Sequence, residues 1–520
     1  MLHRAARMVL VAALAIAALL AIGSLPASAR GAQPRARARA QSLGRARAHG
    51  RAQASQADIL ASVSPTGGGP RVAPGFVGVS LEYRALHLYT GRDPSAVNPV
   101  FLDLLRGLTP GHGPVVRIGG NSTDATWWPI PGVIPPRGVT YGLTDGWLRT
   151  TRALASALGA HLILGVNLAA GRASFAAAEA HAFLQGIGRR YIEALEIGNE
   201  ADVYTLLPWY FNRYGAVHAR SGRYDLAAFT HDFALWSAAL PKVGLAGPAF
   251  AGSGWLGGLP QFLHATRTRL VTLHRYPLRG CIRDPSSPSF ASIPNLLSDR
   301  SSVGLAQSVI PYVAEAHHRR LPFRIDEMNS AACEGRSGVS ETFASALWAL
   351  DTLFSLARVG VDGVNLHTLP GAAYQLFSFT HSHGAWQAFV RPEYYGLLMF
   401  AQAAPSGSRL VPVSAPGGPV KIWATRGSDG RIRATLINKD LSFSHEVQLQ
   451  IPGASGVGSL ERLQAPTVNS TTDVSLGGRT FGSLTGAGTL PEAPQTTPAV
   501  PLFGTYTIDL PPASAALLTG

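Results

Sequence analysis

The sequence predicts an α/β fold, a (β/α)8 barrel followed by an all-β sandwich. Eight short β-rich runs alternate with helix-length amphipathic segments over about 330 residues, as parallel strands joined by crossover helices require. From about Pro405 the pattern changes to short alternating strands and hairpin turns. The alternative is a doubly wound open sheet. No Gly-x-Gly-x-x-Gly motif follows the first predicted strand, which disfavours the nucleotide-binding versions of that sheet.

The N-terminal residues are expected to be processed rather than folded. Residues 1–29 have the pattern of a secretory signal, with Arg4 and Arg7, an apolar core from Met8 to Ile22 and an Ala27-Ser28-Ala29 cleavage site. The apolar core is short for a membrane anchor, the alternative interpretation, because a span needs about 20 residues. We therefore expect a secreted protein with no membrane span after signal removal. Its two cysteines fit an oxidising compartment, where one disulfide can form.

Residues 30–56 are rich in Arg and Ala and contain almost no large apolar side chains, which predicts a disordered tether. The tether either is an inert linker or touches anionic cell-surface polymers. Nine arginines lie before the first acidic residue, Asp58, and without them the formal charge of +14 falls to +5. The remaining charge is compatible with an anionic substrate, and we expect no nucleic-acid partner. Residues 57–74 should form a strand that joins the β-sandwich, followed by a turn.

The barrel is assigned to residues 75–404 and the β-sandwich to residues 405–520. The expected barrel strands, in order, are Phe76–Leu81, Val115–Ile118, Leu162–Val166, Ala194–Ile197, Val243–Ala246, Leu270–Leu273, Phe323–Ile325 and Gly363–Leu366. The helices that follow them are Val100–Leu108, Gly146–Leu158, Ser174–Gly188, Leu226–Leu240, Leu259–Arg267, Val303–His317, Val339–Val359 and Tyr394–Ala403. The sandwich strands include Val420–Arg426, Arg431–Asn438, Glu446–Ile451 and Tyr506–Leu510.

Catalytic side chains of such barrels lie where strands end and lead into helices. Carboxylates, amides and aromatic rings gather at these ends, a mixture that suits sugars, because hydroxyls bind planar polar groups and C–H faces stack on rings. The residues are Glu82, Tyr83, Asn121, Asp124, Trp127, Asn167, Asn199, Glu200, His274, Tyr276, Asp326, Glu327, Asn365 and His367.

Glu200 and Glu327 end the fourth and seventh predicted strands. Strand ends across a barrel mouth can hold two carboxyl groups at the ~5–5.5 Å separation of a retaining glycosidase. One glutamate would then act as nucleophile, and the other as acid and then base. For either glutamate alone, a structural salt bridge is the competing interpretation. For His274 and His367 we expect hydrogen-bonding roles rather than metal ligation. No metal or cofactor motif is found, and no Gly-x-Ser-x-Gly elbow sits at a strand end.

Five stretches together resemble glycoside hydrolase family 79, the β-glucuronidase and heparanase family within the clan A retaining glycosidases. They are Arg117–Ser122, Glu196–Asp202, His274–Leu278, Asp326–Ser330 and Gly371–Tyr374. The resemblance spans roughly residues 57–520. It implies a (β/α)8 barrel with a C-terminal β-sandwich, and no cofactor or metal.

The resemblance implies that Glu200 is the acid/base and Glu327 the nucleophile. Tyr276 would bond to the nucleophile and Asn199 would bind the sugar 2-hydroxyl. Glu82 and Asn121 match positions that contact other hydroxyls, and Tyr374 matches a tyrosine near the uronate carboxylate. One departure is Ala332, where some members have a second carboxylate-binding tyrosine. The neighbouring Cys333 is expected to pair with Cys281, which would tie together the loops after strands six and seven.

The leading hypothesis is a retaining exo-β-glucuronidase that acts on β-linked glucuronic acid or its 4-O-methyl form in glycans or glycosides. An endo-acting, heparanase-like activity is the first alternative. Another clan A specificity, such as a β-xylosidase, uses the same two glutamates, and a non-catalytic glycan-binding protein is the alternative outside enzymes.

Overall fold

A computed structural model describes residues 59–64 and 68–520, which belong to one compact unit. The expected signal segment (1–29), the expected tether (30–56) and residues 57–58 lie outside the described residues. In the part of the chain that is described, no helix combines the length and the apolar character needed to cross a membrane.

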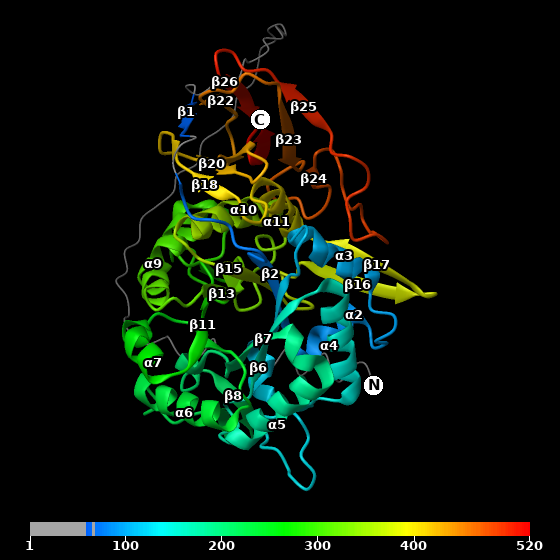
Figure 1. The fold of residues 1–520 in the computed structure, drawn as a ribbon, viewed down its shortest axis with the longest axis vertical. Helices are drawn as coiled ribbons and strands as arrows, with labels where there is room; N and C mark the ends of the chain where they lie inside the picture. Colours follow the sequence, from blue (N-terminus) through cyan, green and yellow to red (C-terminus); the bar gives the residue numbers. More distant parts are fainter. Residues whose placement is uncertain (1–58, 65–67) are drawn as a thin grey trace, which may run out of the picture. The chain divides into compact units, whose positions relative to one another are not determined.

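Eight parallel strands close into a barrel, which confirms the predicted fold class (Figure 1). The last pair in the ring is β7 with β10, where Leu245 lies opposite Leu195. In chain order the strands are β2 (Val77–Glu82), β3 (Val115–Gly119), β6 (His161–Val166), β7 (Ile192–Ile197), β10 (Leu245–Phe250), β11 (Thr268–Arg275), β13 (Phe323–Met328) and β15 (Gly363–Thr368). Since Glu200 follows β7 and Glu327 lies in β13, these residues belong to the fourth and seventh strands, as expected.

Helices surround the strands (Figure 1). They are α2 (Leu86–Thr90), α3 (Pro99–Leu108), α4 (Asp145–Leu158), α5 (Ala173–Phe183), α6 (Leu226–Ala239), α7 (Leu259–Ala265), α8 (Ile293–Leu297), α9 (Val303–His318), α10 (Phe343–Arg358) and α11 (Pro392–Ala403). The starts of α3 and α4 are fixed by capping side chains, since Asn98 and Thr144 accept hydrogen bonds from first-turn amides.

One helix start was predicted four residues too early. The helix expected over 339–359 begins at Phe343, because the residues before it form turns, in which the Ser340 amide donates to the Arg336 carbonyl and the Thr342 amide to the Val339 carbonyl. The helix expected over 174–188 is helical to Gly188 as predicted, with its last turn, Leu184–Gly188, in the π form.

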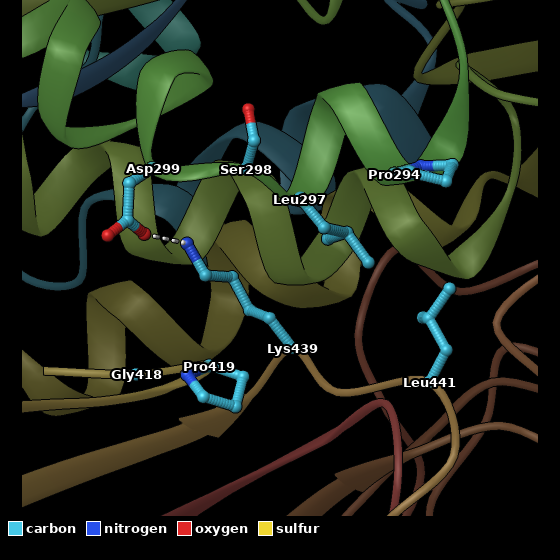
Figure 2. A pocket seen from close by; sticks show the side chains of 8 residues that line it. All are labelled: Pro294, Leu297, Ser298, Asp299, Gly418, Pro419, Lys439 and Leu441. Atoms are coloured by element: carbon cyan, nitrogen blue, oxygen red, sulfur yellow. Dashed lines mark hydrogen bonds and ion pairs between the residues drawn. The ribbon is translucent and has the colours of Figure 1, made fainter.

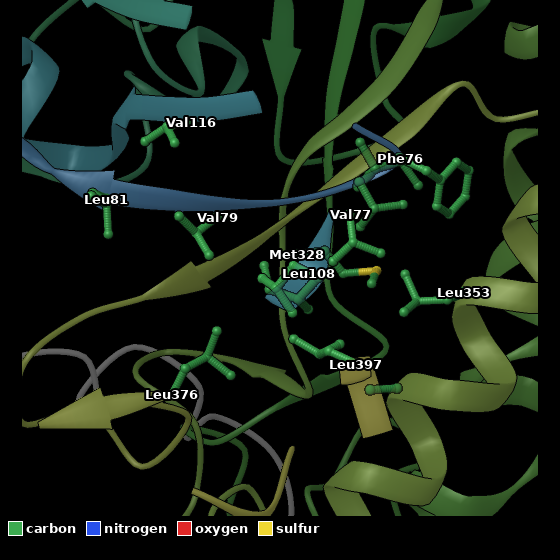
Figure 3. Close-up of a cluster of buried hydrophobic side chains, with 14 of the residues drawn as sticks. Phe76, Val77, Val79, Leu81, Leu108, Val116, Met328, Leu353, Leu376 and Leu397 are labelled. Atoms are coloured by element: carbon green, nitrogen blue, oxygen red, sulfur yellow. The ribbon is translucent and has the colours of Figure 1, made fainter. Parts of the chain in front are cut away.

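The barrel strands alternate between two environments, because successive side chains of a strand point to opposite faces. On β2, Val77, Val79 and Leu81 face outward and join a buried apolar cluster with residues of the surrounding helices, such as Leu108 and Leu353 (Figure 3). Ser80 and Glu82 of the same strand bond to residues of β3 and of the segment that follows it, so they face the barrel interior and mouth. The lower interior is closed by Val115, Ile163, Ala194, Ala246 and Leu270.

Short ribbons in the loops between strands and helices were not predicted. They are the pairs β4 (Thr126–Trp127) with β5 (Tyr141–Gly142), β8 (Pro208–Asn212) with β9 (Gly215–His218), β12 (Leu278–Arg279) with β14 (Ala331–Ala332), and β16 (Phe377–Ser382) with β17 (Ala385–Val390). They lengthen the loops around the mouth of the barrel.

The C-terminal residues form two sheets that share one buried cluster. The smaller contains β19 (Val413–Ser414), β1 (Ile59–Val63), β22 (His445–Gln450) and β26 (Thr505–Leu510), so the blue strand β1 lies among orange and red strands in Figure 1. The larger contains β18 (Arg409–Val411), β20 (Val420–Arg426), β21 (Ile432–Asn438), β27 (Ser514–Thr519), β23 (Gly458–Gln464) and β24 (Ser475–Leu476), with β25 (Thr496–Ala499) paired to β23.

The larger sheet contacts the barrel through a stacked ring and a buried ion pair. Trp423 of β20 stacks on Phe354 of α10, with ring centroids 5.7 Å apart, and its indole N–H donates to Asp351 at 2.9 Å. The ammonium of Lys439 lies 2.8 Å from the fully buried Asp351 carboxylate. It also reaches Asp299, along the wall of a cavity of about 420 Å³ (Figure 2). Lys439 therefore neutralises a charge that the contact between barrel and sheet would otherwise bury alone.

Replacing Lys439 by methionine should lower the free energy of unfolding by about 3–5 kcal/mol, because it leaves the Asp351 carboxylate buried without its cation. Lys421 is the matched control. It pairs with the same Asp299, whose side chain is 61% exposed. Lys421→Met should therefore cost no more than about 1 kcal/mol. Urea unfolding of the two variants measures both values, and equal losses would contradict a special role for Lys439.

Candidate active site

The mouth of the barrel is lined by polar side chains that most of the strands deliver inward. Arg117 is the centre of this group and is fully buried. Its guanidinium donates to Glu196 and Glu327 at 2.7 Å each and to the Asn199 side chain at 2.9 Å. Because the donors of an arginine form a rigid planar fork, these contacts fix three strand ends relative to one another.

Glu327 is held as an ionised carboxylate. Its Oε1 accepts from the Tyr276 hydroxyl at 2.9 Å and its Oε2 from Arg117. Burial acts against ionisation, but His367 and His274 when protonated, Arg117 and the Tyr276 hydrogen bond together lower the pKa of Glu327 well below its usual range. A buried carboxylate that stays charged can act as a nucleophile.

Glu200 stands on the opposite side of the mouth. It follows β7 in the left-handed conformation, with φ 53° and ψ 47°, which is rare for a residue other than glycine. Its amide donates to the Ala249 carbonyl at 3.0 Å, and its Oε1 lies 2.9 Å from His274 Nδ1. Strained backbone of this kind is kept where the surroundings fix a side chain for function.

Glu200 and Glu327 face each other closely. One carboxylate oxygen of each lies within 4.8 Å of the other and of a His274 ring nitrogen. This approach of the nearest oxygens is compatible with the ~5–5.5 Å between the two carboxyl groups of a retaining glycosidase.

The remaining residues expected at the site surround this pair. Glu82 accepts from the amides of Asn121 at 3.0 Å and Ser122 at 2.7 Å, and burial raises its pKa. Gly120 is required there, because a Cβ would lie 2.3 Å from a Glu82 oxygen and its φ is +68°. The Asn199 amide group lies 3.3 Å from the Asn121 side-chain oxygen.

Tyr374 and Tyr276 stand together beside the nucleophile. Their ring centroids are 6.3 Å apart, and Tyr374 also meets the His367 ring at 5.9 Å. Burial raises the pKa of Tyr374, with a smaller effect from the nearby carboxylates of Glu327 and Glu82, so its hydroxyl stays protonated as a hydrogen-bond donor.

Cys281 and Cys333 form a disulfide, with Cα atoms 5.7 Å apart. It lies just beyond the ribbon in which Arg279 of β12 is paired with Ala332 of β14. The loops after β11 and β13 are thereby joined beside Glu327. The side chain of Ala332 is a methyl group, whereas the resemblance to the family led us to compare this position with a tyrosine that binds the carboxylate.

Sequence reasoning assigned no role to Arg117 or Glu196 and placed Asp326 among the polar strand ends. In the structure all three are fully buried in the barrel, with Arg117 Nε 3.2 Å from Asp326. A signal for Glu196 was available. It lies two residues after Ala194, an inward position, whereas the other charge of the strand, Glu193, alternates to the opposite face and is exposed, and an inward charge in a barrel needs a partner.

Asp326 and Glu196 differ in protonation. Burial acts against the charge on Glu196, but Arg117 outweighs it and lowers the pKa of Glu196. Burial and the neighbouring Glu196 raise the pKa of Asp326 well above 3.8. Arg117 thus faces two carboxylates, Glu196 and Glu327, and one neutral acid.

The ligand types of a metal site occur in two groups of side chains, Glu196-His274-Asp326 and Glu200-His274-Glu327. The Arg117 guanidinium already supplies positive charge to both groups.

The proton held by Asp326 predicts that the effect of Asp326→Asn on stability depends on pH. The folded protein holds a proton that the unfolded chain releases above pH 3.8, so the Asp326 contribution to stability is complete below that pH and is lost as pH rises. Asp326→Asn removes this loss. The free energy of unfolding of Asp326→Asn, measured relative to that of wild type, should therefore increase by up to about 1.4 kcal/mol for each pH unit above pH 3.8.

Denaturant unfolding between pH 4 and 7 measures this difference, and a difference independent of pH would contradict the assignment. Asp429 is a control of opposite sign, because its hydrogen bond to Arg433 is the main cause that lowers its pKa to about 2. Asp429→Asn should lose stability relative to wild type as pH rises from about 2 to 3.8, and between pH 4 and 7 its difference from wild type should be nearly constant.

Comparison with known proteins finds this fold in several enzymes. No family model and no curated protein sequence matches the chain. Among solved structures, a 4-O-α-L-rhamnosyl-β-D-glucuronidase from Fusarium oxysporum 12S, in complex with Rha-GlcA, matches with a TM-score of 0.71 and 21% identity, over 88% of this chain and 99% of that one. The likeness is one of fold.

Two further structures share it at lower identity. The GH51 arabinofuranosidase from Xanthomonas axonopodis pv. citri has a TM-score of 0.63 and 14% identity over 89% of this chain and 100% of that one. The xyloglucanase of GH family 44 from Paenibacillus polymyxa has a TM-score of 0.57 and 11% identity over 89% of this chain and 99% of that one. These matches support the barrel architecture without assigning a substrate.

Proposed function

We propose that this protein is a retaining exo-β-glucuronidase, of the kind found in glycoside hydrolase family 79. The observation that carries the proposal is the pair Glu200 and Glu327, whose carboxylate oxygens approach within 4.8 Å in a mouth lined by amides and tyrosines. This close approach supports the retaining double displacement.

In the first step Glu327 attacks the anomeric carbon of the terminal uronic acid. Glu200 gives its proton to the glycosidic oxygen, the bond from the anomeric carbon to that oxygen breaks, and the leaving group departs with the proton. A glucuronyl ester on Glu327 remains. Arg117 and the Tyr276 hydroxyl hold the two oxygens of Glu327 in position for the attack.

In the second step a water molecule replaces the leaving group. The ionised Glu200 takes a proton from this water, whose oxygen attacks the anomeric carbon and breaks the ester bond. Glu327 returns to its carboxylate form and Glu200 to its protonated form. Because the configuration at the anomeric carbon is inverted twice, it is retained overall. In both steps the reacting groups of the protein are the side chains of Glu200 and Glu327.

The uronate specificity rests on the residues around the pair. Asn199, Asn121 and Glu82 form a polar wall for the sugar hydroxyls, and the protonated hydroxyl of Tyr374 is a donor suited to the carboxylate. A glucuronidase is also among the enzymes with this fold. Ala332 provides no hydrogen-bond donor from its side chain, so Tyr374 has the larger share of this recognition.

Parallel assays with the aryl β-glucuronide, β-glucoside and β-xyloside test the proposal. We expect the glucuronide to have the highest kcat/KM, by about 100-fold or more, because a site built for a buried carboxylate leaves polar groups unpaired with the other sugars. Faster hydrolysis of the xyloside would overturn the uronate assignment and favour a β-xylosidase. Absence of hydrolysis in all three assays would favour a glycan-binding protein. Cleavage within a glycan chain would favour an endo-acting enzyme.

We also propose that the enzyme acts outside the cytoplasm. The signal-like pattern of residues 1–29 and the Cys281–Cys333 disulfide support this, since disulfides persist in oxidising compartments. N-terminal sequencing of protein recovered from the culture medium should find a chain that starts after Ala29, and retention of the intact N-terminus inside cells would contradict export.

A further inference from the structure

A cavity of about 210 Å³ opens beside the acid/base residue. At one end it is lined by Asn121, Asn199 and Glu200, all of which belong to the catalytic mouth. It therefore adjoins the catalytic mouth on the Glu200 side, since Glu327 does not line it. Because about 10–15 Å³ of such volume already holds one water molecule, the cavity has room for a group much larger than water.

The other end of the cavity is apolar. Its wall is formed by Val203, Leu207, Pro208 and Trp209, from the segment that follows Glu200 and from the first strand of the β8–β9 ribbon. Besides Glu200, the carboxylate of Asp124 lines the cavity, but it already accepts from the amides of Leu168 and Ala169 and from the Tyr204 hydroxyl. The wall thus offers ring and methyl surfaces and no free charge.

Trp209 is held rigidly as part of this wall. Its indole N–H donates to the Asp124 carbonyl at 2.9 Å. Gly138 lies against the ring, and a Cβ at that position would come within 2.2 Å of indole Cε2. Asp124 in turn accepts from the Asn199 amide at 3.2 Å, so the ring is tied to the residue before Glu200. A fixed aromatic face binds a ring at little entropic cost.

The chemistry decides what this cavity receives. Glu200 protonates the glycosidic oxygen, so the group bonded to that oxygen must lie beside Glu200. We propose that the cavity between Glu200 and Trp209 binds the leaving group and selects a neutral ring with an apolar face. A sugar ring and an aryl group share this chemistry. The inference rests on the proposed glucuronidase function and adds its leaving-group specificity.

The test compares leaving groups in wild type and Trp209→Ala. The substrates are phenyl β-glucuronide, a β-glucuronyl disaccharide with a neutral second sugar, and methyl β-glucuronide, whose leaving group has no ring. In Trp209→Ala, we expect the ratio of kcat/KM for a ring substrate to that for the methyl substrate to fall about 10- to 100-fold. A fall with the disaccharide identifies a sugar ring as the ligand, and a fall with the phenyl substrate alone identifies an aryl group.

Charge is tested with wild type and a 4-carboxyphenyl β-glucuronide. We expect it to be hydrolysed at least tenfold less efficiently than the phenyl compound, and a preference for the charged group would overturn the inference. Trp209→Phe keeps a ring without the N–H and should keep the substrate ratio within about threefold, which covers the case in which Trp209→Ala does not fold. Tyr214→Ala is the matched control, because Tyr214 is 81% exposed in the turn of the same ribbon and does not line the cavity.

The failures of the two proposals are distinguishable. If wild type hydrolyses none of the β-glucuronides, the proposed function fails. If wild type hydrolyses them and Trp209→Ala leaves the substrate ratio unchanged, the function stands and the leaving-group site is overturned.

Discussion

Replacing Glu327 by glutamine is expected to lower kcat/KM for an aryl β-glucuronide by at least about 10⁴-fold, or roughly 5 kcal/mol of transition-state stabilisation. The amide is nearly the same size as the carboxylate but cannot form the glucuronyl ester. It also has one oxygen where the carboxylate has two, so it cannot accept from both Arg117 and Tyr276 as Glu327 does. The loss should appear in kcat, because chemistry rather than binding is removed.

Initial-rate assays with the folded variant measure this loss. Glu446→Gln is the control, since Glu446 is a carboxylate of β22 in the smaller C-terminal sheet and not in the mouth of the barrel. The control should retain activity within about twofold. Activity of Glu327→Gln close to that of the control would show that Glu327 is not the nucleophile.

The repeating pattern of strands and helices was predictable because it depends on local patterning. Runs such as Leu162–Val166 are apolar and short, and the segments between them have the spacing of amphipathic helices. The ribbons in the loops were not predictable in the same way. The β8–β9 ribbon has exposed side chains such as Phe211 and Tyr214, so no alternation of buried and exposed residues marks it in the sequence.

The positions of Glu200, Glu327 and Asn199 followed from the strand count, because catalytic groups occupy strand ends in a barrel. The roles of Arg117 and Glu196 did not follow. Their partners come from different strands, and Arg117 and Glu327 are 210 residues apart in the chain. The division of charge between Glu196 and Asp326 depends on burial and on distances, which only the folded structure provides.

Replacing Glu200 by glutamine should have an effect that depends on the leaving group. Glutamine cannot protonate the glycosidic oxygen, and general acid catalysis contributes about 10²–10⁴-fold. Hydrolysis of methyl or sugar glucuronides should therefore fall by about that factor in kcat/KM. A dinitrophenyl group leaves as a stable anion without a proton, so its kcat/KM should fall by less than about tenfold.

The same variant should also accumulate the covalent intermediate. With a dinitrophenyl glucuronide the first step stays fast, but the second lacks the base that activates water, so a burst of dinitrophenol should precede slow turnover. Stopped-flow absorbance shows the burst, and intact-protein mass spectrometry shows the glucuronyl adduct. Asp202→Asn is the control, because the Asp202 carboxylate accepts from the amides of Ala251 and Gly252 and holds the same loop.

Asp202→Asn can lower all rates by loosening the loop, but it should lower them equally for good and poor leaving groups. A positioning defect acts on every substrate, whereas loss of an acid acts only where a proton is needed. A leaving-group dependence in Glu200→Gln that matches this control would remove Glu200 from the acid/base role. The left-handed backbone at Glu200 would then be a feature of the loop alone.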